Sequence, residues 1–226
     1  MAATGDSVWV TSSQDDTVTR VDPTSNETVA IIDVGASPVG VTATRDAVWV
    51  ANYFDGTVTR VDPVSDEAVA TVEVGAAPVA VAATSDAVWV SNYFDGTVTR
   101  VDPVSDEAVA TVDVGASPVA VAVTSDAVWV ANGDDGTVSR IDPSSNEVVA
   151  TIEVGESPSG LAATSDAVWV ANTEDDTVSQ IDPSDNRVVA TIDVDASPQG
   201  VAEGGDDIWV TNSGGGTVSR IDSSPN

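Results

Sequence analysis

Short stretches with alternating hydrophobic and polar residues recur along the entire chain, separated by turns rich in Asp, Gly, Pro and Ser. Alternation with a period of two is typical of a β-strand with one packed and one exposed face. The first stretch of each group consists of small residues, which suits a strand in a crowded centre. Because only short turns join the stretches, we expect antiparallel sheets and no helices. In one representative segment the predicted strands are residues 78–83, 87–90, 97–102 and 108–114.

The turns between these strands have a chemistry of their own. Asp95-Gly96 provides residues that tolerate positive φ in a tight hairpin. Residues 102–106 contain a proline, which fixes φ, and Asp102, which can accept a local backbone hydrogen bond. Residues 115–118 then lead into the next group, so each group of strands is predicted to form one four-stranded sheet.

The whole pattern repeats every forty residues. Residues 48–87 return almost unchanged as residues 88–127. A period near forty built from short strands is typical of the blades of a β-propeller. The repeat is marked by Trp9, Trp49, Trp89, Trp129, Trp169 and Trp209. The two near-identical copies differ at Ala51/Ser91, Glu73/Asp113, Ala77/Ser117 and Ala83/Val123.

We therefore predict an all-β chain, with residues 1–226 forming a single β-propeller domain of four-stranded antiparallel blades. The tryptophan strand occurs six times, whereas the fourth strand occurs five times and last appears at residues 190–194. The chain stops at residues 222–226, where another fourth strand would begin. Six blades fit this count, with the last blade lacking its outer strand. A five-bladed ring with overlapping ends, or an oligomer of open arcs, is the alternative.

Four phrases of the repeat resemble the YVTN/YncE-like β-propeller family and, more loosely, the NHL and virginiamycin B lyase-like propellers. The resemblance covers essentially the whole chain and implies the propeller fold. It implies a scaffold, a surface-protein module or a binding platform rather than one activity. The lyase relatives use histidine in catalysis, and this chain has none. The phrases are residues 48–52, 136–143, 149–155 and 157–162.

Composition argues against an enzyme. The chain contains neither cysteine nor histidine, which removes the commonest nucleophile, general base and metal ligands. A carboxylate-based hydrolase is the remaining enzymatic alternative, and a retaining glycosidase would need two acids about 5–5.5 Å apart. Most acids here occupy equivalent, widely spaced positions in successive repeats. We expect no catalytic residue, no cofactor and no metal site.

The charge restricts the partners and the setting. Thirty-seven acids face seven bases, all of them arginine, giving a net charge of −30. Such a chain repels phosphate, so we expect no nucleic-acid and no membrane partner. The lysine-free, acidic composition resembles that of salt-in halophiles, with an acidic mesophilic or engineered protein as the alternative. No apolar run approaches the ~18 residues of a membrane span and no signal peptide is evident. We expect a soluble protein from the cytoplasm or cell surface of a salt-adapted organism, without choosing between these compartments.

Many of the acids have a structural interpretation. The fourth strand of each repeat ends with an acid, such as Asp33 or Glu73, which discourages edge-to-edge pairing of sheets. Aspartates such as Asp55 and Asp95 follow the tryptophan strand and could form oxygen-rich cation sites. Aspartate before glycine is also an ordinary hairpin residue, and we favour that interpretation.

Two substitutions coincide in the fifth repeat. Gln180 stands where the first repeat has Arg20, and Arg187 stands where it has Glu27. Residues on one face of a hairpin lie within diagonal reach of each other. We therefore expect Arg20 and Glu27 to form a structural pair whose members are exchanged in the fifth repeat. Such surface pairs stabilise a protein by only about 0–1 kcal/mol.

The blade structure requires the same residues in every repeat, so functional residues are best sought at the positions where the repeats differ. The loops after the tryptophan strand differ most, and two adjacent loops hold all the Tyr and Phe residues: Tyr53, Phe54, Tyr93 and Phe94. Exposed paired aromatics indicate a docking patch for a protein, a peptide or a glycan. The alternative is that duplication copied them without selection. We expect a non-enzymatic binding scaffold that uses this loop face; the alternative is a purely structural, recently amplified or engineered repeat protein without a dedicated ligand.

Three further positions stand out near the end of the chain. Gln199 and Glu203 replace apolar residues of the first strand and are candidates for contacting a ligand or ion in a central channel. The alternative for Glu203 is a looser turn over residues 203–205. Asp195 replaces a glycine, which we interpret as another residue tolerant of positive φ. The predicted edge strand 217–221 is expected to allow self-association.

The net charge of −30 predicts that folding depends on salt. At 1 M salt the screening length falls to about 3 Å, which removes most of the self-repulsion of the acidic surface. We expect the melting temperature, followed by circular dichroism, to be higher in concentrated potassium chloride than in dilute buffer. Equal melting temperatures in the two solutions would contradict this prediction.

Overall fold

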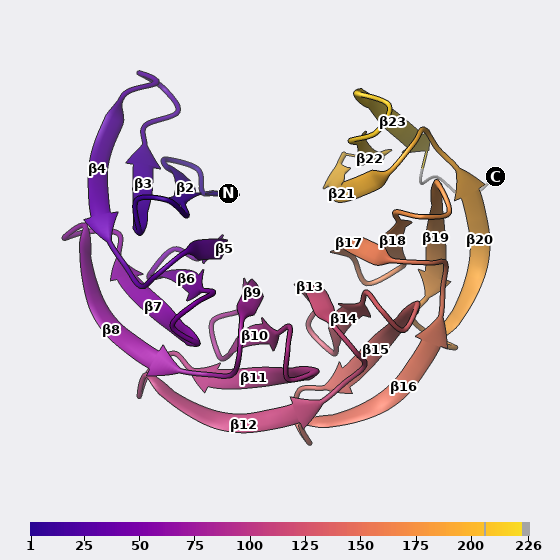
Figure 1. Cartoon of the computed structure of the whole chain (residues 1–226), viewed down its shortest axis with the longest axis horizontal. Helices are drawn as coiled ribbons and strands as arrows, with labels where there is room; N and C mark the ends of the chain where they lie inside the picture. The colour runs from indigo at the N-terminus through magenta and orange to yellow at the C-terminus, as the bar shows by residue number, and fades with distance from the viewer. Residues whose placement is uncertain (206, 223–226) are drawn as a thin grey trace. The chain divides into compact units, whose positions relative to one another are not determined.

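A computed structural model describes residues 1–205 and 207–222, and every regular element among them is a β-strand. The 23 strands form six antiparallel sheets, five with four strands and the last with three (Figure 1). Within each sheet the strands lie in chain order. The all-β prediction, the six blades and the three-stranded last blade are confirmed, and the five-bladed alternative is wrong. Residues 223–226, where we placed the end of the chain before a missing strand, lie outside the described residues.

The representative blade has β9 (Pro78–Ala83), β10 (Val88–Asn92), β11 (Thr97–Asp102) and β12 (Glu107–Asp113), so the predicted boundaries hold within two residues. The other strands are as follows. Blade 1 has β1 (Ala2–Ala3), β2 (Val8–Ser12), β3 (Thr17–Val21) and β4 (Thr28–Asp33); blade 2 has β5 (Pro38–Ala43), β6 (Val48–Asn52), β7 (Thr57–Asp62) and β8 (Glu67–Glu73). Blade 4 has β13 (Pro118–Val123), β14 (Val128–Asn132), β15 (Thr137–Asp142) and β16 (Glu147–Glu153); blade 5 has β17 (Pro158–Ala163), β18 (Val168–Asn172), β19 (Thr177–Asp182) and β20 (Arg187–Asp193). Blade 6 has β21 (Pro198–Gly204), β22 (Asp207–Asn212) and β23 (Thr217–Asp222).

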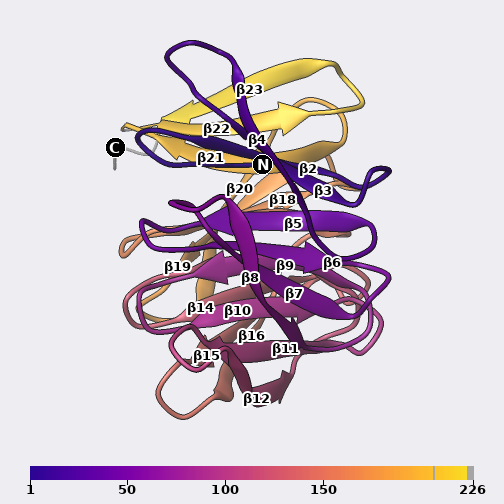
Figure 2. The ribbon, with the colours of Figure 1, turned by 90° about the vertical axis from the view of Figure 1, so that its left-hand side faces the viewer.

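The chain divides into two compact units. Met1–Asp113 contains blades 1 to 3, and Val114–Asn226 contains blades 4 to 6. Within each unit, successive sheets stack face to face, as β5–β8 and β9–β12 do in Figure 2. Our expectation of a single domain stays a prediction. Among the described residues, no helix is long and apolar enough to cross a membrane.

The hydrophobic core of each unit lies between successive blades. In the first unit, Trp9 and Val18 of blade 1 are buried against Val48, Val50 and Val61 of blade 2. In the second unit, blade 4 packs in the same way on blade 5, with the tryptophan again at the centre of the cluster. The strand that carries the tryptophan is rich in valine and buried on both faces, which explains its β-branched and aromatic composition.

An arginine on the third strand joins blade 1 to blade 2, blade 2 to blade 3, and blade 4 to blade 5. The Arg20 guanidinium lies 5.6 Å above the ring of Trp9 and forms a 3.0 Å ion pair with Asp66 in blade 2. It also donates a 2.8 Å hydrogen bond to the carbonyl of Pro63. The expected pairing of Arg20 with Glu27 is therefore wrong. The ion pair runs between blades rather than across one hairpin.

The turns follow the predicted chemistry, with one informative variation. Gly96 has φ of 64°, and the same position is Asp16 in blade 1, with φ of 57°. In the next turn, Asp102 Oδ1 accepts the N–H of Val104 at 2.8 Å. Aspartate can replace glycine in the hairpin because it tolerates the left-handed region better than most residues.

The first strands of successive blades approach each other closely. An ideal Cβ added to Gly40 would lie 2.5 Å from the carbonyl oxygen of Val79 on the next blade. At Gly160 the collision with the carbonyl of Gln199 would be closer still. The small residues of this strand are thus required by backbone approaching backbone.

Gly160→Ala tests this crowding. We expect the free energy of unfolding to fall by about 1–3 kcal/mol, because a methyl group would have to displace a neighbouring strand. Denaturant unfolding of the variant would measure the change. Gly5→Ala is the matched control, since no atom lies within 4 Å of the added Cβ and stability should be almost unchanged. Equal effects of the two substitutions would contradict the prediction.

Candidate binding site

In blades 2 to 6, a buried asparagine anchors the base of the loop after the tryptophan strand. In blade 2, Asn52 Nδ2 donates hydrogen bonds to Thr57 Oγ1 at 3.0 Å and Thr59 Oγ1 at 2.8 Å. Its Oδ1 accepts the N–H of Gly35, in the segment that arrives from blade 1, at 3.1 Å. Asn52 therefore ties the loop to the incoming linker and is structural. Corresponding Nδ2 bonds are made by Asn92, Asn132, Asn172 and Asn212.

The loop aspartates make a second connection to the linker. Asp55 Oδ2 accepts the N–H of Ala36 at 2.7 Å, and Asp95 Oδ2 accepts that of Ala76 at 2.7 Å. One oxygen of each carboxylate thus accepts a backbone N–H, which is a structural role for these acids. Within residues 1–205 and 207–222, no three acids are grouped so that they could hold a metal ion.

These two connections explain the linker glycine. A Cβ on Gly35 would lie 2.7 Å from side-chain atoms of both Asn52 and Asp55. Positive φ falls instead on the serine two residues later, with φ of 54° at Ser37. Glycine is needed here because side chains approach it closely, and our interpretation of Asp195 as a positive-φ replacement is wrong.

In the last blade, the linker glycine and the loop aspartate exchange places. Asp195 stands in the linker where the other blades have glycine, and Gly215 stands in the loop where they have aspartate. Asp195 Oδ1 accepts the N–H of Ala196 at 2.8 Å, the equivalent of the Ala36 bond, and Oδ2 accepts the Thr217 hydroxyl at 2.7 Å. The bonds from Thr217 and Ala196 lower the pKa of the Asp195 carboxyl below its usual value. The carboxylate has moved from loop to linker and still satisfies the same backbone group.

Held on this framework, the predicted aromatic residues come together. The rings of Tyr53 and Phe94, from adjacent loops, lie 6.0 Å apart between centroids. The Tyr53–Phe54 and Tyr93–Phe94 ring pairs are each 5.3 Å apart, and all three contacts are edge-to-face. The four rings therefore form one continuous row, which we call the aromatic row.

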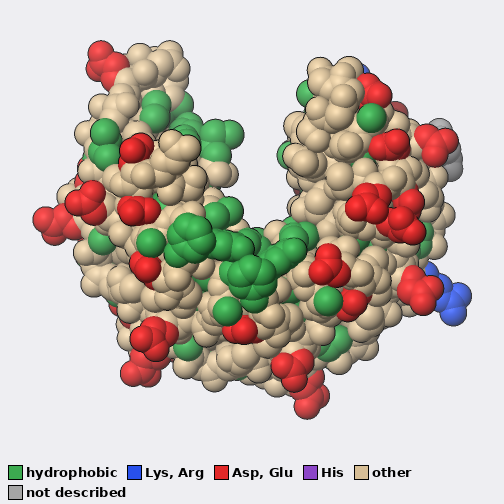
Figure 3. Space-filling model, in the orientation of Figure 1, with side chains coloured by type: hydrophobic (Ala, Val, Ile, Leu, Met, Phe, Trp, Pro, Cys, Tyr) green, Lys and Arg blue, Asp and Glu red, His purple; other side chains and the backbone are tan. Residues whose placement is uncertain are grey.

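The aromatic row lies on the surface but its backbone is fixed. Phe54 is 76% exposed and Phe94 is 68% exposed, whereas both tyrosines are half-buried. The N–H groups of Tyr93 and Phe94 donate to the carbonyls of Ala77 and Ala76 at 3.0 and 3.3 Å. Figure 3 shows hydrophobic side chains gathered over blades 2 and 3, with acidic side chains around them. Large exposed rings on a fixed backbone are suited to docking.

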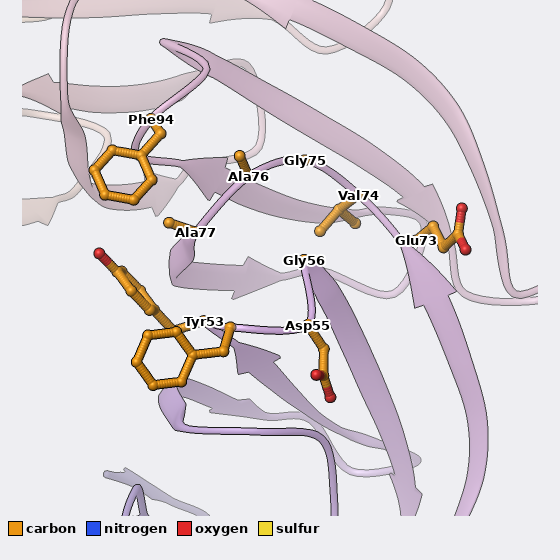
Figure 4. Close-up of a pocket in the computed structure, with 10 residues that line it drawn as sticks. Tyr53, Asp55, Gly56, Glu73, Val74, Gly75, Ala76, Ala77 and Phe94 are labelled. Carbon is orange, nitrogen blue, oxygen red and sulfur yellow. The ribbon is translucent and has the colours of Figure 1, made fainter.

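A groove of about 610 Å³ continues from the aromatic row between the two loops. The rings of Tyr53 and Phe94 lie on one side of it, and Glu73 lies on the other (Figure 4). Asp55 also lines the groove, but its carboxylate points away from Ala76 and Ala77, toward the N–H of Ala36. Sequence reasoning missed Glu73, which we interpreted only as an acid that protects a sheet edge. A signal was present, because two of the four differences between the near-identical repeats line this groove. They are Glu73/Asp113 and Ala77/Ser117.

The other two predicted residues lie in the second unit. Gln199 and Glu203 are exposed on β21. Glu203 pairs in register with Ile208, and the strands continue to a turn at Gly205, with φ of 70°. The turn that we expected over residues 203–205 is therefore correct only at Gly205, because Glu203 and Gly204 belong to β21. Neither residue shares a unit with the aromatic row.

Comparison with known proteins identifies the fold class. No protein-family profile and no curated protein matches the chain. Among solved structures, virginiamycin B lyase from Staphylococcus aureus is 13% identical with a TM-score of 0.80, over 100% of this chain and 84% of that one. The computationally designed Ika8 protein is 17% identical with a TM-score of 0.82, over 98% and 70%. A functionally unknown protein from Desulfotomaculum acetoxidans is 15% identical with a TM-score of 0.81, over 96% and 79%.

These likenesses agree with the six repeated antiparallel sheets, and the chain has a β-propeller fold. Sequence identities of 13–17% show the fold alone.

Gly215→Asp and Asp195→Gly test the exchange in the last blade. A side chain on Gly215 would collide with the Asp195 carboxylate, so Gly215→Asp alone should lower the free energy of unfolding by about 1–3 kcal/mol. Asp195→Gly added to it recreates the arrangement of the other blades and should recover most of the loss. Denaturant unfolding of both single variants and the double variant gives the coupling free energy between positions 195 and 215. Strictly additive effects would contradict the exchange.

Proposed function

We propose that this β-propeller is a non-enzymatic scaffold that binds a partner through the loop face of blades 2 and 3. The observation that carries the proposal is the aromatic row, in which four rings are in contact and two are largely exposed. Row and groove both lie within the first unit. Aromatic anchors on a rigid frame dominate many protein interfaces.

The composition supports a binding role over catalysis. The chain has no histidine or cysteine, and Asp55 and Asp95 each use a carboxylate oxygen to accept a backbone N–H. A neighbour in fold is named as a lyase, but its fold alone assigns no reaction to this chain. Within the propellers, the repeated phrases support membership of the YVTN/YncE-like family.

A purely structural repeat protein is the second candidate. It is favoured by the near-identity of residues 48–87 and 88–127 and by the likeness to a designed propeller. Against it stand the two substitutions in the groove, at Glu73 and Ala77, since duplication without selection gives no reason for changes to gather there.

The partner we propose is a protein or peptide, with a glycan as the alternative. The net charge of −30 opposes nucleic acids and anionic membranes. Self-association through the edge of β23 is a further expectation. A salt-adapted cell, with the protein in its cytoplasm or on its surface, would fit this acidity.

Replacing Tyr53, Phe54, Tyr93 and Phe94 by serine tests the proposed function. The substitutions remove all four rings of the aromatic row, including the largely exposed Phe54 and Phe94, so we expect partner affinity to fall at least about tenfold. Partners retained from lysate of the source organism would be identified by mass spectrometry and their dissociation constants measured with purified components.

The matched control is Val64→Ser with Val104→Ser. These valines are 89% and 88% exposed and lie in turns outside the groove. Circular dichroism would verify the fold of both variants. The proposal fails if the two variants bind the same partner equally well.

A further inference from the structure

The groove beside the aromatic row has two chemically different sides, and its chemistry indicates what it accepts. Tyr53 and Phe94 form one side, Glu73 lies at the other, and Ala76 lies between them (Figure 4). No basic residue lines it. This inference rests on the proposed function and specifies the partner.

The aromatic side favours apolar and cationic groups. Edge-to-face packing of Tyr53 on Phe94, with ring planes 62° apart, does not stack the ring faces on each other. An aromatic face carries negative electrostatic potential, so it attracts a cation as well as an apolar side chain. The exposed faces therefore suit an apolar side chain that has a basic neighbour.

The acidic side has a carboxylate that is available to a partner. Glu73 ends β8, is exposed, and its carboxylate accepts no hydrogen bond or ion pair within the described part of the chain. Asp55 uses Oδ2 for the N–H of Ala36, so its carboxylate faces the preceding linker and not the groove. A free carboxylate at one side of a groove, in a chain of net charge −30, attracts cations and repels anions.

The floor between the two sides is unusually apolar for this chain. At the positive-φ position of the linker, blades 1, 3, 4 and 5 are followed by serine, whereas blade 2 is followed by Ala77, with φ of 55°. In the next linker, Ser117 donates its hydroxyl to Asp134 at 2.6 Å. Alanine leaves a methyl group and no hydroxyl beneath the rings of Tyr53 and Phe94.

We propose that the groove binds an extended basic peptide segment of a partner protein, in which apolar and arginine or lysine side chains alternate. The apolar side chain packs on Tyr53 and Phe94 over the methyl group of Ala77, and the neighbouring cation pairs with Glu73. A neutral glycan would use the rings but would gain little from the carboxylate.

Fluorescence anisotropy with fluorescein-labelled ten-residue peptides tests the proposal on the full chain. The probes alternate leucine with arginine, with glutamine or with glutamate. We expect the leucine–arginine peptide to bind at least about tenfold more tightly than the leucine–glutamine peptide, because charge-assisted contacts are lost in the latter. The leucine–glutamate peptide should not bind.

Glu73→Gln and Glu153→Gln separate the groove from general attraction to an acidic protein. Both remove one charge from the end of a fourth strand, and Glu153 is likewise exposed. Glu73→Gln should weaken the leucine–arginine peptide roughly fivefold to tenfold and leave the leucine–glutamine peptide unchanged, as expected for a direct charge-assisted contact. Glu153→Gln should change neither. Ala77→Ser should weaken both peptides.

Equal effects of Glu73→Gln and Glu153→Gln would overturn the proposal, since they would show attraction by net charge alone. Equal binding of the arginine and glutamine peptides, or binding of neutral oligosaccharides in preference to them, would also overturn it. In those cases the proposed function would stand if the four-serine variant still lost its partner. Only an unaffected four-serine variant would remove the function itself.

Discussion

The connection between each loop and the linker that enters its blade is the constraint on which the surface chemistry depends. In blade 2, an amide and a carboxylate from the loop, those of Asn52 and Asp55, hold the linker through the N–H groups of Gly35 and Ala36. The carboxylate contact recurs in blades 3 to 5 through Asp95, Asp135 and Asp175, and the asparagine Nδ2 bonds recur in blades 3 to 6, so these two positions serve the structure. The side chains of the two residues between them, Tyr53 and Phe54, take no part in these contacts, and their positions differ widely from blade to blade.

That division explains why a binding surface can be built on a nearly invariant repeat. The tryptophan and valine side chains bury the faces between blades, and the arginines extend the contact to the next blade's turn. Loop residues outside this frame add no core packing, so aromatic rings can be placed there at little expense to stability. Because their backbone is already rigid, less conformational entropy is lost when a partner binds.

The strands and turns were predictable because their signals are local. Alternation identified β9 and β11 to the residue, and Asp95-Gly96 identified a hairpin. Contacts between blades were not predictable in this way. The partner of Arg20 is Asp66, forty-six residues away, and the role of Gly35 depends on side chains from the next blade. The aromatic row was found because the repeats differ there, whereas Glu73 was missed because an acid occurs at that position in every complete repeat.

The exchange of Asp195 and Gly215 has a consequence for a chain whose repeats are so alike. Near-identical segments can pair with the wrong neighbour while the chain folds, since each linker fits several loops equally well. A linker with Asp195 would face a second carboxylate in the loops of other blades, and a glycine loop would leave an ordinary linker's N–H without its acceptor. The final blade therefore fits only its own linker, which fixes its position as the last of several otherwise similar blades.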